Sequence, residues 1–295
     1  MKASVIIPVY NGKKFIAQTI QSALDQTLQG HEVIVVNDGS TDNSEKEILK
    51  FRDRVVYIKQ ENKGVSAARN IGIQRAKSEY IAFLDQDDIF MPNKLKKLAS
   101  FLDQHPGYGM VYSQISRIDG DGNLLAAKKI PTHSGDIFPQ LFMKCYIAPS
   151  MAMCRKQMLL DAGLFQERFS SEGEDYDIFL RLARAAPVGV VQEELVMYRV
   201  HMENVSKKGQ DLAPFRGEEI LSQYKDYLIE NYRMGWWYYR KRMSKIYREQ
   251  AKVYLSQGRV SDGRKCLKRS LGLYPFRFDV IKKYLVVRAQ EKNIG

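Results

Sequence analysis

The amino-acid sequence predicts an α/β fold in which a mainly parallel sheet is covered by helices and is followed by a helical extension. Within the first 90 residues, short runs rich in Val and Ile alternate with segments of helical period. Polar loops follow several of these runs. Beyond residue 215 the periodicity is helical throughout. With 295 residues, the chain is long enough to bury an enzyme-sized core.

The predicted sheet begins near the N-terminus. Apolar runs typical of buried strands occupy residues 4–9, 32–37, 55–60 and 80–84. Helices are expected at residues 13–28, 42–51 and 65–76, and later at 93–103 and from Glu174 onward. Two later strands are expected at 110–113 and 195–200. Because strands and helices alternate, parallel pairing is favoured, and such sheets bind ligands at the carboxyl ends of their strands.

The charge distribution separates the extension from the first domain. Residues 232–295 contain 17 Lys and Arg against 4 Asp and Glu, a net charge of +13. Residues 1–231 contain 29 against 30, a net charge of −1. We therefore predict a domain over residues 1–210, with halves at 1–90 and 91–210, and a basic helical extension over residues 211–295.

Composition excludes several classes of protein. With 44% hydrophobic and 27% charged residues, the chain is neither collagen-like nor wholly disordered. Its three cysteines form no CxxC pair, which argues against a disulfide framework and fits a reducing compartment. The N-terminal apolar run is too short for a signal peptide, and no window is apolar enough to span a membrane. We expect a cytoplasmic protein, either free or peripheral at the inner face of the membrane.

The segment Asp85-Gln86-Asp87-Asp88 is the strongest local signal for a binding site. Carboxylates two residues apart at a strand end point the same way and can share a divalent cation. Mn²⁺ and Mg²⁺ prefer oxygen ligands and leave positions for phosphate oxygens. The alternative is an acidic loop that caps the following helix, and the motif by itself leaves both open.

Three other residues near strand ends or in the intervening helix have both a binding and a structural interpretation. Tyr10 can stack on a base or can belong to the rim of the core. Asp38 can accept hydrogen bonds from a base or ribose, or can act as a helix N-cap. Arg69 lies in a helix of small residues, from which a long cation can reach a crevice or form a surface salt bridge.

In this order and spacing, four segments resemble the nucleotide-binding half of family-2 glycosyltransferases with the GT-A fold. The segments read SVIIPVYNG, VIVVNDGSTDNS, NKGVSAARNIGI and YIAFLDQDD. The resemblance implies a sugar-nucleotide donor, with Tyr10, Asp38 and Arg69 around the base and Asp85 near the ribose or sugar. It assigns Mn²⁺ or Mg²⁺ to Asp87 of the DXD motif. Further donor-binding residues within these segments are Pro8, Asn11, Gly39, Ser40 and Gln86. Asn37 departs from the family, which often has a second Asp there.

The second half extends the resemblance. Glu174-Asp175 is similar to the acidic pair of the family, which implies that Asp175 is the general base of an inverting reaction with Glu174 beside it. The structural alternative is that these carboxylates only favour a helix N-terminus. Residues 198–206 resemble the segment YRxHxxNxS, which implies a metal or phosphate contact for His201 and phosphate neutralisation by Arg199.

The resemblance implies a metal-dependent, inverting hexosyltransferase that moves a sugar from a nucleotide diphosphate sugar, UDP-sugar favoured, to an acceptor hydroxyl. The implied setting is polysaccharide, lipopolysaccharide or glycolipid synthesis, with a saccharide or lipid-linked saccharide as the acceptor. The alternative is a non-catalytic nucleotide-binding module whose tail binds a partner or a membrane. A sugar-nucleotide pyrophosphorylase fits less well, because residues 8–12 do not form a basic, Gly-rich loop.

The extension contains the sequence GWWYYRKR at residues 235–242, which combines aromatic and cationic side chains. This combination suits peripheral contact with anionic lipid headgroups. It also suits packing against the sheet domain or against a second copy in a homodimer. We expect no nucleic-acid partner, because no nucleic-acid-binding motif accompanies the charge.

Overall fold

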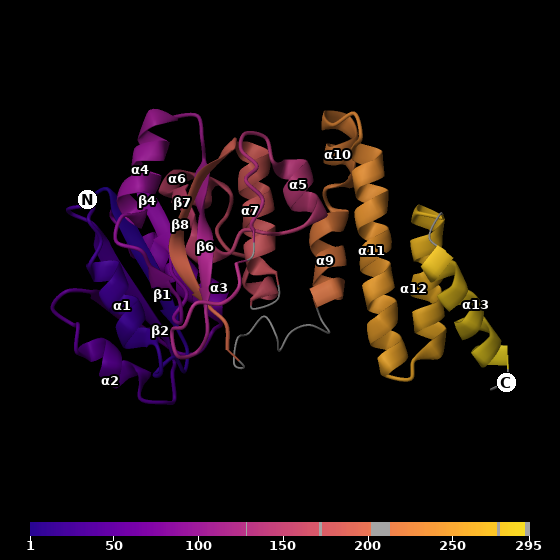
Figure 1. The fold of residues 1–295 in the computed structure, drawn as a ribbon, viewed down its shortest axis with the longest axis horizontal. Coiled ribbons are helices and arrows are strands. Elements are labelled where there is room, and N and C mark those ends of the chain that lie inside the picture. The colour runs from indigo at the N-terminus through magenta and orange to yellow at the C-terminus, as the bar shows by residue number, and fades with distance from the viewer. Residues whose placement is uncertain (128, 171–172, 202–212, 276–277, 293–295) are drawn as a thin grey trace. The chain divides into compact units, whose positions relative to one another are not determined.

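The computed structural model describes residues 1–127, 129–170, 173–201, 213–275 and 278–292 (Figure 1). The chain divides into two compact units. The first comprises Met1–Leu141 and Cys145–Asn204, and the second comprises Phe142–Lys144 and Val205–Gly295. The domain boundary expected between residues 210 and 211 lies outside the described residues.

The first unit contains one eight-stranded sheet with the strand order β3-β2-β1-β4-β7-β6-β8-β5. Its strands are β1 (Ala3–Val9), β2 (Glu32–Asp38), β3 (Val56–Gln60), β4 (Tyr80–Phe83), β5 (Ile89–Phe90), β6 (Met110–Ile118), β7 (Ala152–Arg155) and β8 (Val188–Arg199). The pairs β1–β2, β1–β4, β2–β3 and β6–β8 are parallel. β7 runs antiparallel to β4 and β6, and β5 runs antiparallel to β8. The prediction of a mainly parallel sheet is confirmed.

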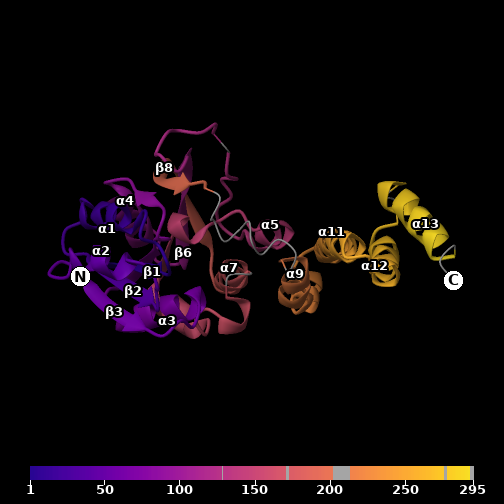
Figure 2. The same ribbon diagram turned by 90° about the horizontal axis from the view of Figure 1, so that it is seen from below.

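Helices cover both faces of this sheet. The helices of this unit are α1 (Ile16–Leu24), α2 (Ser44–Leu49), α3 (Val65–Arg75), α4 (Lys94–Gln104), α6 (Lys156–Asp161) and α7 (Glu174–Ala185). A further helix, α5 (Phe138–Met143), begins in the first unit and ends in the second. Val5 on β1 belongs to the same apolar cluster as Ile20 of α1 and Leu98 of α4. Ile6 faces α3, where a Cβ on Gly72 would lie 2.5 Å from its side chain. In Figure 2, α1 and α4 accordingly lie on one side of β1 and α3 lies on the other.

Two strands are longer than the sequence indicates. β6 continues to Ile118, and β8 begins at Val188, because the two strands pair along most of their length. Register shifts at Gln114 interrupt this pairing. The polar residues 192–194 of β8 lie at the irregularity and break the apolar pattern by which a buried strand is recognised.

The second unit is helical, as predicted. Its helices are α9 (Ala213–Ser222), α10 (Lys225–Asn231), α11 (Gly235–Ser256), α12 (Val260–Leu273) and α13 (Phe278–Lys292). α11 to α13 share a small core that includes Ala251, Leu267 and Val280. α10 and α11 approach closely at Gly235, where a Cβ would lie 1.7 Å from the carbonyl oxygen of Leu228. None of the described helices combines the length and the apolar character needed to cross a bilayer.

Candidate functional site

One side-chain amide ties the loops that follow β1 and β4. Gln86 donates from Nε2 to the Tyr10 carbonyl oxygen at 3.1 Å, and its Oε1 accepts the Tyr10 backbone N–H at 2.8 Å. Gly12 leaves room for this amide, because a Cβ there would lie 2.5 Å from Oε1. The side chain of Tyr10 stays 46% exposed. Two predicted donor-binding residues thus lie together, with an aromatic ring exposed beside them.

The loops after β1 and β2 also meet. Asn11 Oδ1 accepts the Thr41 backbone N–H at 2.8 Å, and Ser40 Oγ accepts the Asn11 backbone N–H at 3.1 Å. The Ser40 backbone N–H donates to Asn37 Oδ1 at 3.0 Å, so Asn37 has a structural function at this turn. Asn11 and Ser40, both predicted to bind the donor, therefore lie in one loop cluster, whereas Pro8 is buried within β1.

Asp38 is buried at the end of β2 and holds the loop that leads into α3. Its carboxylate accepts the backbone N–H groups of Lys63 and Gly64, both at 2.8 Å. Gly39 follows in the left-handed region with a φ of 69°, and a Cβ there would lie 2.7 Å from the backbone nitrogen of Asn62. Both predicted residues lie at the sheet edge, and the carboxylate contacts of Asp38 in the structure are with the protein itself.

Arg69 joins the two halves of the first unit. It is 3% exposed, and it donates from Nη2 to Asp85 Oδ1 at 2.8 Å and from Nη1 to Glu174 Oε1 at 3.0 Å. Its guanidinium lies over the Phe165 ring, 5.2 Å from the centroid. Burial alone would lower the pKa of Arg69, but the two carboxylates outweigh burial and raise this pKa. The side chain thus forms a buried double ion pair instead of a surface salt bridge.

Asp175 is the carboxylate adjacent to this ion pair. It lies half-buried in the first turn of α7, which begins after Gly173 at a φ of 120°. Its Oδ1 accepts the Tyr176 backbone N–H at 2.7 Å. Burial and the nearby charge of Glu174 raise the pKa of Asp175 to about 7, although Arg69 acts in the opposite direction. A carboxyl group with this pKa can exchange a proton near neutral pH.

Asp87 and His201, the two predicted metal ligands, lie next to each other. Oδ2 of Asp87 is 2.8 Å from Nε2 of His201, and both side chains are largely buried. The two atoms form a hydrogen bond at this distance. A shared Mg²⁺ would replace it without moving them far, because atoms that bind one Mg²⁺ at right angles are also about 3 Å apart. Burial, and then the charge of Asp85, raise the pKa of Asp87. Across the described residues, no three His, Cys, Asp or Glu side chains form a complete metal site, so this pair fits only if water and substrate supply other ligands.

Arg199 stabilises the loop that contains Asp87 and Asp88 through hydrogen bonds. Its backbone N–H donates to Asp88 Oδ1 at 2.9 Å, and its Nε donates to the Asp87 carbonyl oxygen at 2.9 Å. Its Nη2 donates to Gln18 Oε1 at 2.8 Å, and its guanidinium lies over the Phe15 ring. These contacts give Arg199 a structural function at this loop, and its expected phosphate contact stays a prediction.

Three further residues contribute to this part of the structure, and two of them, Ser150 and Lys94, carry no sequence signal. The Asn70 amide exchanges two hydrogen bonds of 2.9 Å with the backbone of Phe165, which lies 95 residues away. Ser150 Oγ accepts the Asp85 backbone N–H at 3.0 Å. Lys94 is fully buried at the start of α4, where burial lowers its pKa to about 7. Only Asn70 is indicated by the sequence, because it follows Arg69 within a recognisable segment.

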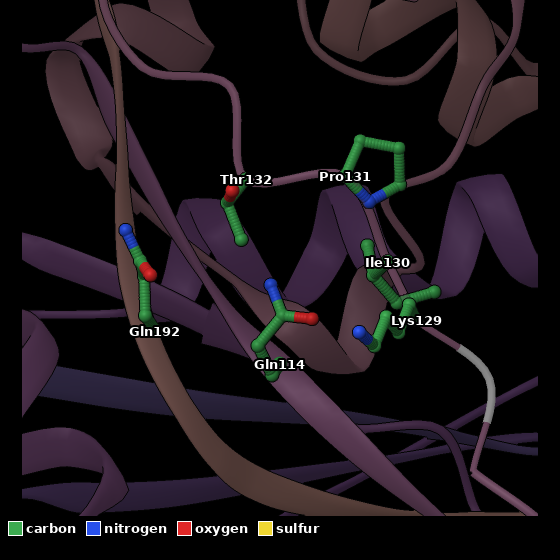
Figure 3. Close-up of a pocket in the computed structure, with 6 residues that line it drawn as sticks. All are labelled: Gln114, Lys129, Ile130, Pro131, Thr132 and Gln192. Atoms are coloured by element: carbon green, nitrogen blue, oxygen red, sulfur yellow. The ribbon is translucent and has the colours of Figure 1, made fainter.

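A pocket of about 460 Å³ opens elsewhere on the first unit (Figure 3). It is lined by Gln114, Lys129, Ile130, Pro131, Thr132 and Gln192. The Tyr112 hydroxyl donates to the carbonyl oxygen of Pro131 at 2.8 Å and so fixes the loop that forms one wall. None of the lining residues belongs to the predicted site, so this pocket is distinct from the polar cluster at the strand ends.

A mainly parallel sheet between helices, with acidic and aromatic residues gathered at the carboxyl ends of β1, β2 and β4, defines a protein of the GT-A fold. Comparison with solved structures agrees. S. aureus TarS 1–349 in complex with UDP-GlcNAc aligns with a TM-score of 0.62 at 18% identity, over 93% of this chain and 89% of that one.

Sequence comparison then identifies the family. Residues 4–162 match the model for Glycosyl transferase family 2. An uncharacterized glycosyltransferase of Rickettsia bellii is 36% identical over 208 residues, which are 70% of this chain and 30% of that protein. Chondroitin synthase of Escherichia coli is 29% identical over 224 residues, which are 75% of this chain and 32% of that protein. The chain thus spans about a third of the length of these two curated relatives. It belongs to glycosyl transferase family 2.

Proposed function

We propose that the chain transfers a sugar from a UDP-sugar to an acceptor hydroxyl, with inversion at the anomeric carbon. Family membership supports a glycosyltransferase, and the UDP-GlcNAc complex of TarS supports a uridine donor. The observation that carries the proposal is Asp175. Its pKa is raised to about 7, and it lies beside the ion pair through which Arg69 joins α7 to the loop after β4.

In the proposed reaction, Asp175 is the general base. Its carboxylate takes the proton of the acceptor hydroxyl as the hydroxyl oxygen bonds to the anomeric carbon. The bond between this carbon and the diphosphate oxygen breaks, and its electron pair leaves with UDP. Because attack comes from the face opposite UDP, the configuration inverts. Glu174 serves as the positioning partner, since its carboxylate is held by Arg69 at 3.0 Å.

The donor occupies the ends of β1, β2 and β4 in this proposal. The exposed ring of Tyr10 stacks on the base, and Asp85 lies near the ribose or sugar. Asp87 and His201 hold Mn²⁺ or Mg²⁺, which when bound neutralises the charge of the leaving diphosphate. Their adjacency supports this assignment, and the hydrogen bond between them would give way to the cation.

The acceptor we propose is a saccharide or lipid-linked saccharide, in polysaccharide, lipopolysaccharide or glycolipid synthesis. A relative named chondroitin synthase supports a saccharide acceptor. We place the protein in the cytoplasm, peripheral at the inner face of the membrane. Support for this placement comes from aromatic and cationic side chains of the second unit, described below.

The experiment compares UDP with other nucleoside diphosphates in a thermal-shift assay, each with and without Mn²⁺, and then measures UDP release from UDP-GlcNAc and other UDP-sugars. A ligand that binds only the folded state raises the unfolding temperature. We expect a Mn²⁺-dependent shift with UDP, and UDP release that Asp175→Asn lowers by about 10²–10⁴-fold. Binding without release from any UDP-sugar would favour the non-catalytic nucleotide-binding module. The absence of any nucleotide shift would contradict both.

A further inference from the structure

Four large apolar side chains are exposed within nine residues at the junction of α10 and α11. Ile229 is 42% exposed, Met234 50%, Trp236 46% and Trp237 36%. We call these four residues the Trp surface. In Figure 1, α10 and the first turns of α11 lie at the same end of the second unit. Such a concentration of exposed apolar groups marks an interaction surface.

Cations surround the Trp surface. Lys241 Nζ lies 4.2 Å from the centroid of the Trp237 ring. Lys225 and Arg240 lie 5.7 and 5.4 Å from the Trp236 ring. Residues 225–245 contain six Lys and Arg against two Asp and Glu. The apolar groups therefore sit within a positive field, which favours an anionic partner.

Contacts within α10, α11 and α12 hold the Trp surface in place. Gly235 starts α11 against the carbonyl oxygen of Leu228, and Lys225 of α10 lies over the Trp236 ring that follows. Trp236 stacks on Tyr239 with an interplanar angle of 9°. Arg240 donates from Nε to the Leu273 carbonyl oxygen at 2.6 Å and so links α11 to the end of α12. The indoles project from a packed scaffold and not from a loose terminus.

We propose that the Trp surface docks on an anionic lipid bilayer. Indole rings favour the headgroup region, where an apolar body meets a polar environment. Lys225 and Lys241 lie over the Trp236 and Trp237 rings, and such cations can bind lipid phosphates. Charge complementarity favours this partner, because residues 232–295 carry a net charge of +13. Its use in reaching a lipid-linked acceptor rests on the proposed function, but the docking itself does not.

The chain provides its own reporter for this proposal. It contains two tryptophans, Trp236 and Trp237, so intrinsic indole fluorescence reports on the Trp surface alone. The probe is a vesicle of phosphatidylcholine, either pure or mixed with phosphatidylglycerol. We expect a blue shift of emission and quenching by brominated acyl chains with the mixed vesicles. An unchanged emission spectrum with both vesicles would overturn the proposal.

Variants distinguish binding through the Trp surface from non-specific adsorption to vesicles. Cosedimentation of Trp236→Ser/Trp237→Ser with mixed vesicles should be lost, whereas Leu124→Ser, at a 73% exposed apolar residue of the first unit, should bind normally. Lys241→Gln, which keeps both indoles, should bind about fivefold more weakly, because each surface cation contributes about 1 kcal/mol. Equal binding by wild type and Lys241→Gln, or equal loss in Leu124→Ser, would refute the assignment.

Two controls distinguish other occupants. If the surface instead joins two copies of the chain, light scattering without vesicles gives a dimer that the double Trp variant converts to a monomer, and that result would overturn lipid docking. The UDP-dependent thermal shift should be the same in wild type and in the surface variants. A failure of the proposed transferase activity would leave vesicle binding unchanged, so the two proposals fail independently.

Discussion

Replacing Asp175 by Asn tests the chemistry and the electrostatics of the site in one variant. The pKa of Asp175 is raised from 3.8 to about 7, and the folded state therefore binds this proton more tightly than the unfolded state does. At 1.36 kcal/mol for each pKa unit, ionising this group in the folded protein costs at most about 4 kcal/mol. That cost is absent below pH 4 and grows as the pH rises to 7.

Asn is close in size to a protonated Asp and carries no charge at any pH. We therefore expect wild type and Asp175→Asn to have equal stability at pH 4 and the variant to be more stable at pH 8. In a domain of this size, each kcal/mol corresponds to about 2–4 °C in unfolding temperature. UDP release should fall by about 10²–10⁴-fold, and wild-type release should rise with pH through a midpoint near 7.

Differential scanning fluorimetry between pH 4 and pH 8, together with a coupled assay for UDP, measures both effects. The control is the UDP-dependent shift in unfolding temperature, which the variant should retain. Parallel stability curves at all pH values would refute the raised pKa. Wild-type rates of UDP release from the variant would show that another residue is the base.

Other substitutions probe the buried ion pair, the metal ligands and the second unit. Arg69→Met leaves two carboxylates without their shared cation, so the free energy of unfolding should fall by about 3–5 kcal/mol in urea titrations. Unchanged urea midpoints would contradict this. Asp87→Asn and His201→Gln each remove one proposed metal ligand, and the Mn²⁺-dependent part of the UDP shift should disappear in both. A shift that survives in both would remove the metal assignment. Gly235→Ala places a Cβ 1.7 Å from the Leu228 carbonyl oxygen, so Trp emission should move to the red while UDP binding persists.

The order of elements in the first half could be predicted because its strands are continuous apolar runs. β8 was only partly predicted, since its central residues are polar at the irregularity in its pairing with β6. The alternation of apolar and polar residues indicates which side chains face the core. A bulge interrupts this alternation although the strand continues. The position of β7, antiparallel between β4 and β6, could also not be predicted from the sequence, because tertiary contacts decide which strands pair.

Individual site residues could be placed at the sheet edge, but their partners could not. The sequence predicts for Arg69 either a cation that reaches the crevice or a surface salt bridge. It cannot indicate the partner Glu174, which lies 105 residues further along the chain. Gln86 was assigned to the donor, and the structure shows its amide bound to the backbone of Tyr10. The residue type indicates which hydrogen bonds or ion pairs a side chain can form. The fold decides which partners within the protein it actually contacts. The metal, donor and catalytic assignments remain predictions.

The amide bridge between Gln86 and Tyr10 limits how this site can be redesigned. The two loops share one set of hydrogen bonds, and the space for it exists only because residue 12 has no side chain. A chimaera that imports either loop alone would bring an unmatched partner to the bridge and lose both hydrogen bonds to the Tyr10 backbone. Under the proposed function, a transfer of donor preference therefore requires the exchange of both loops, with Tyr10, Gly12 and Gln86 moved as a set.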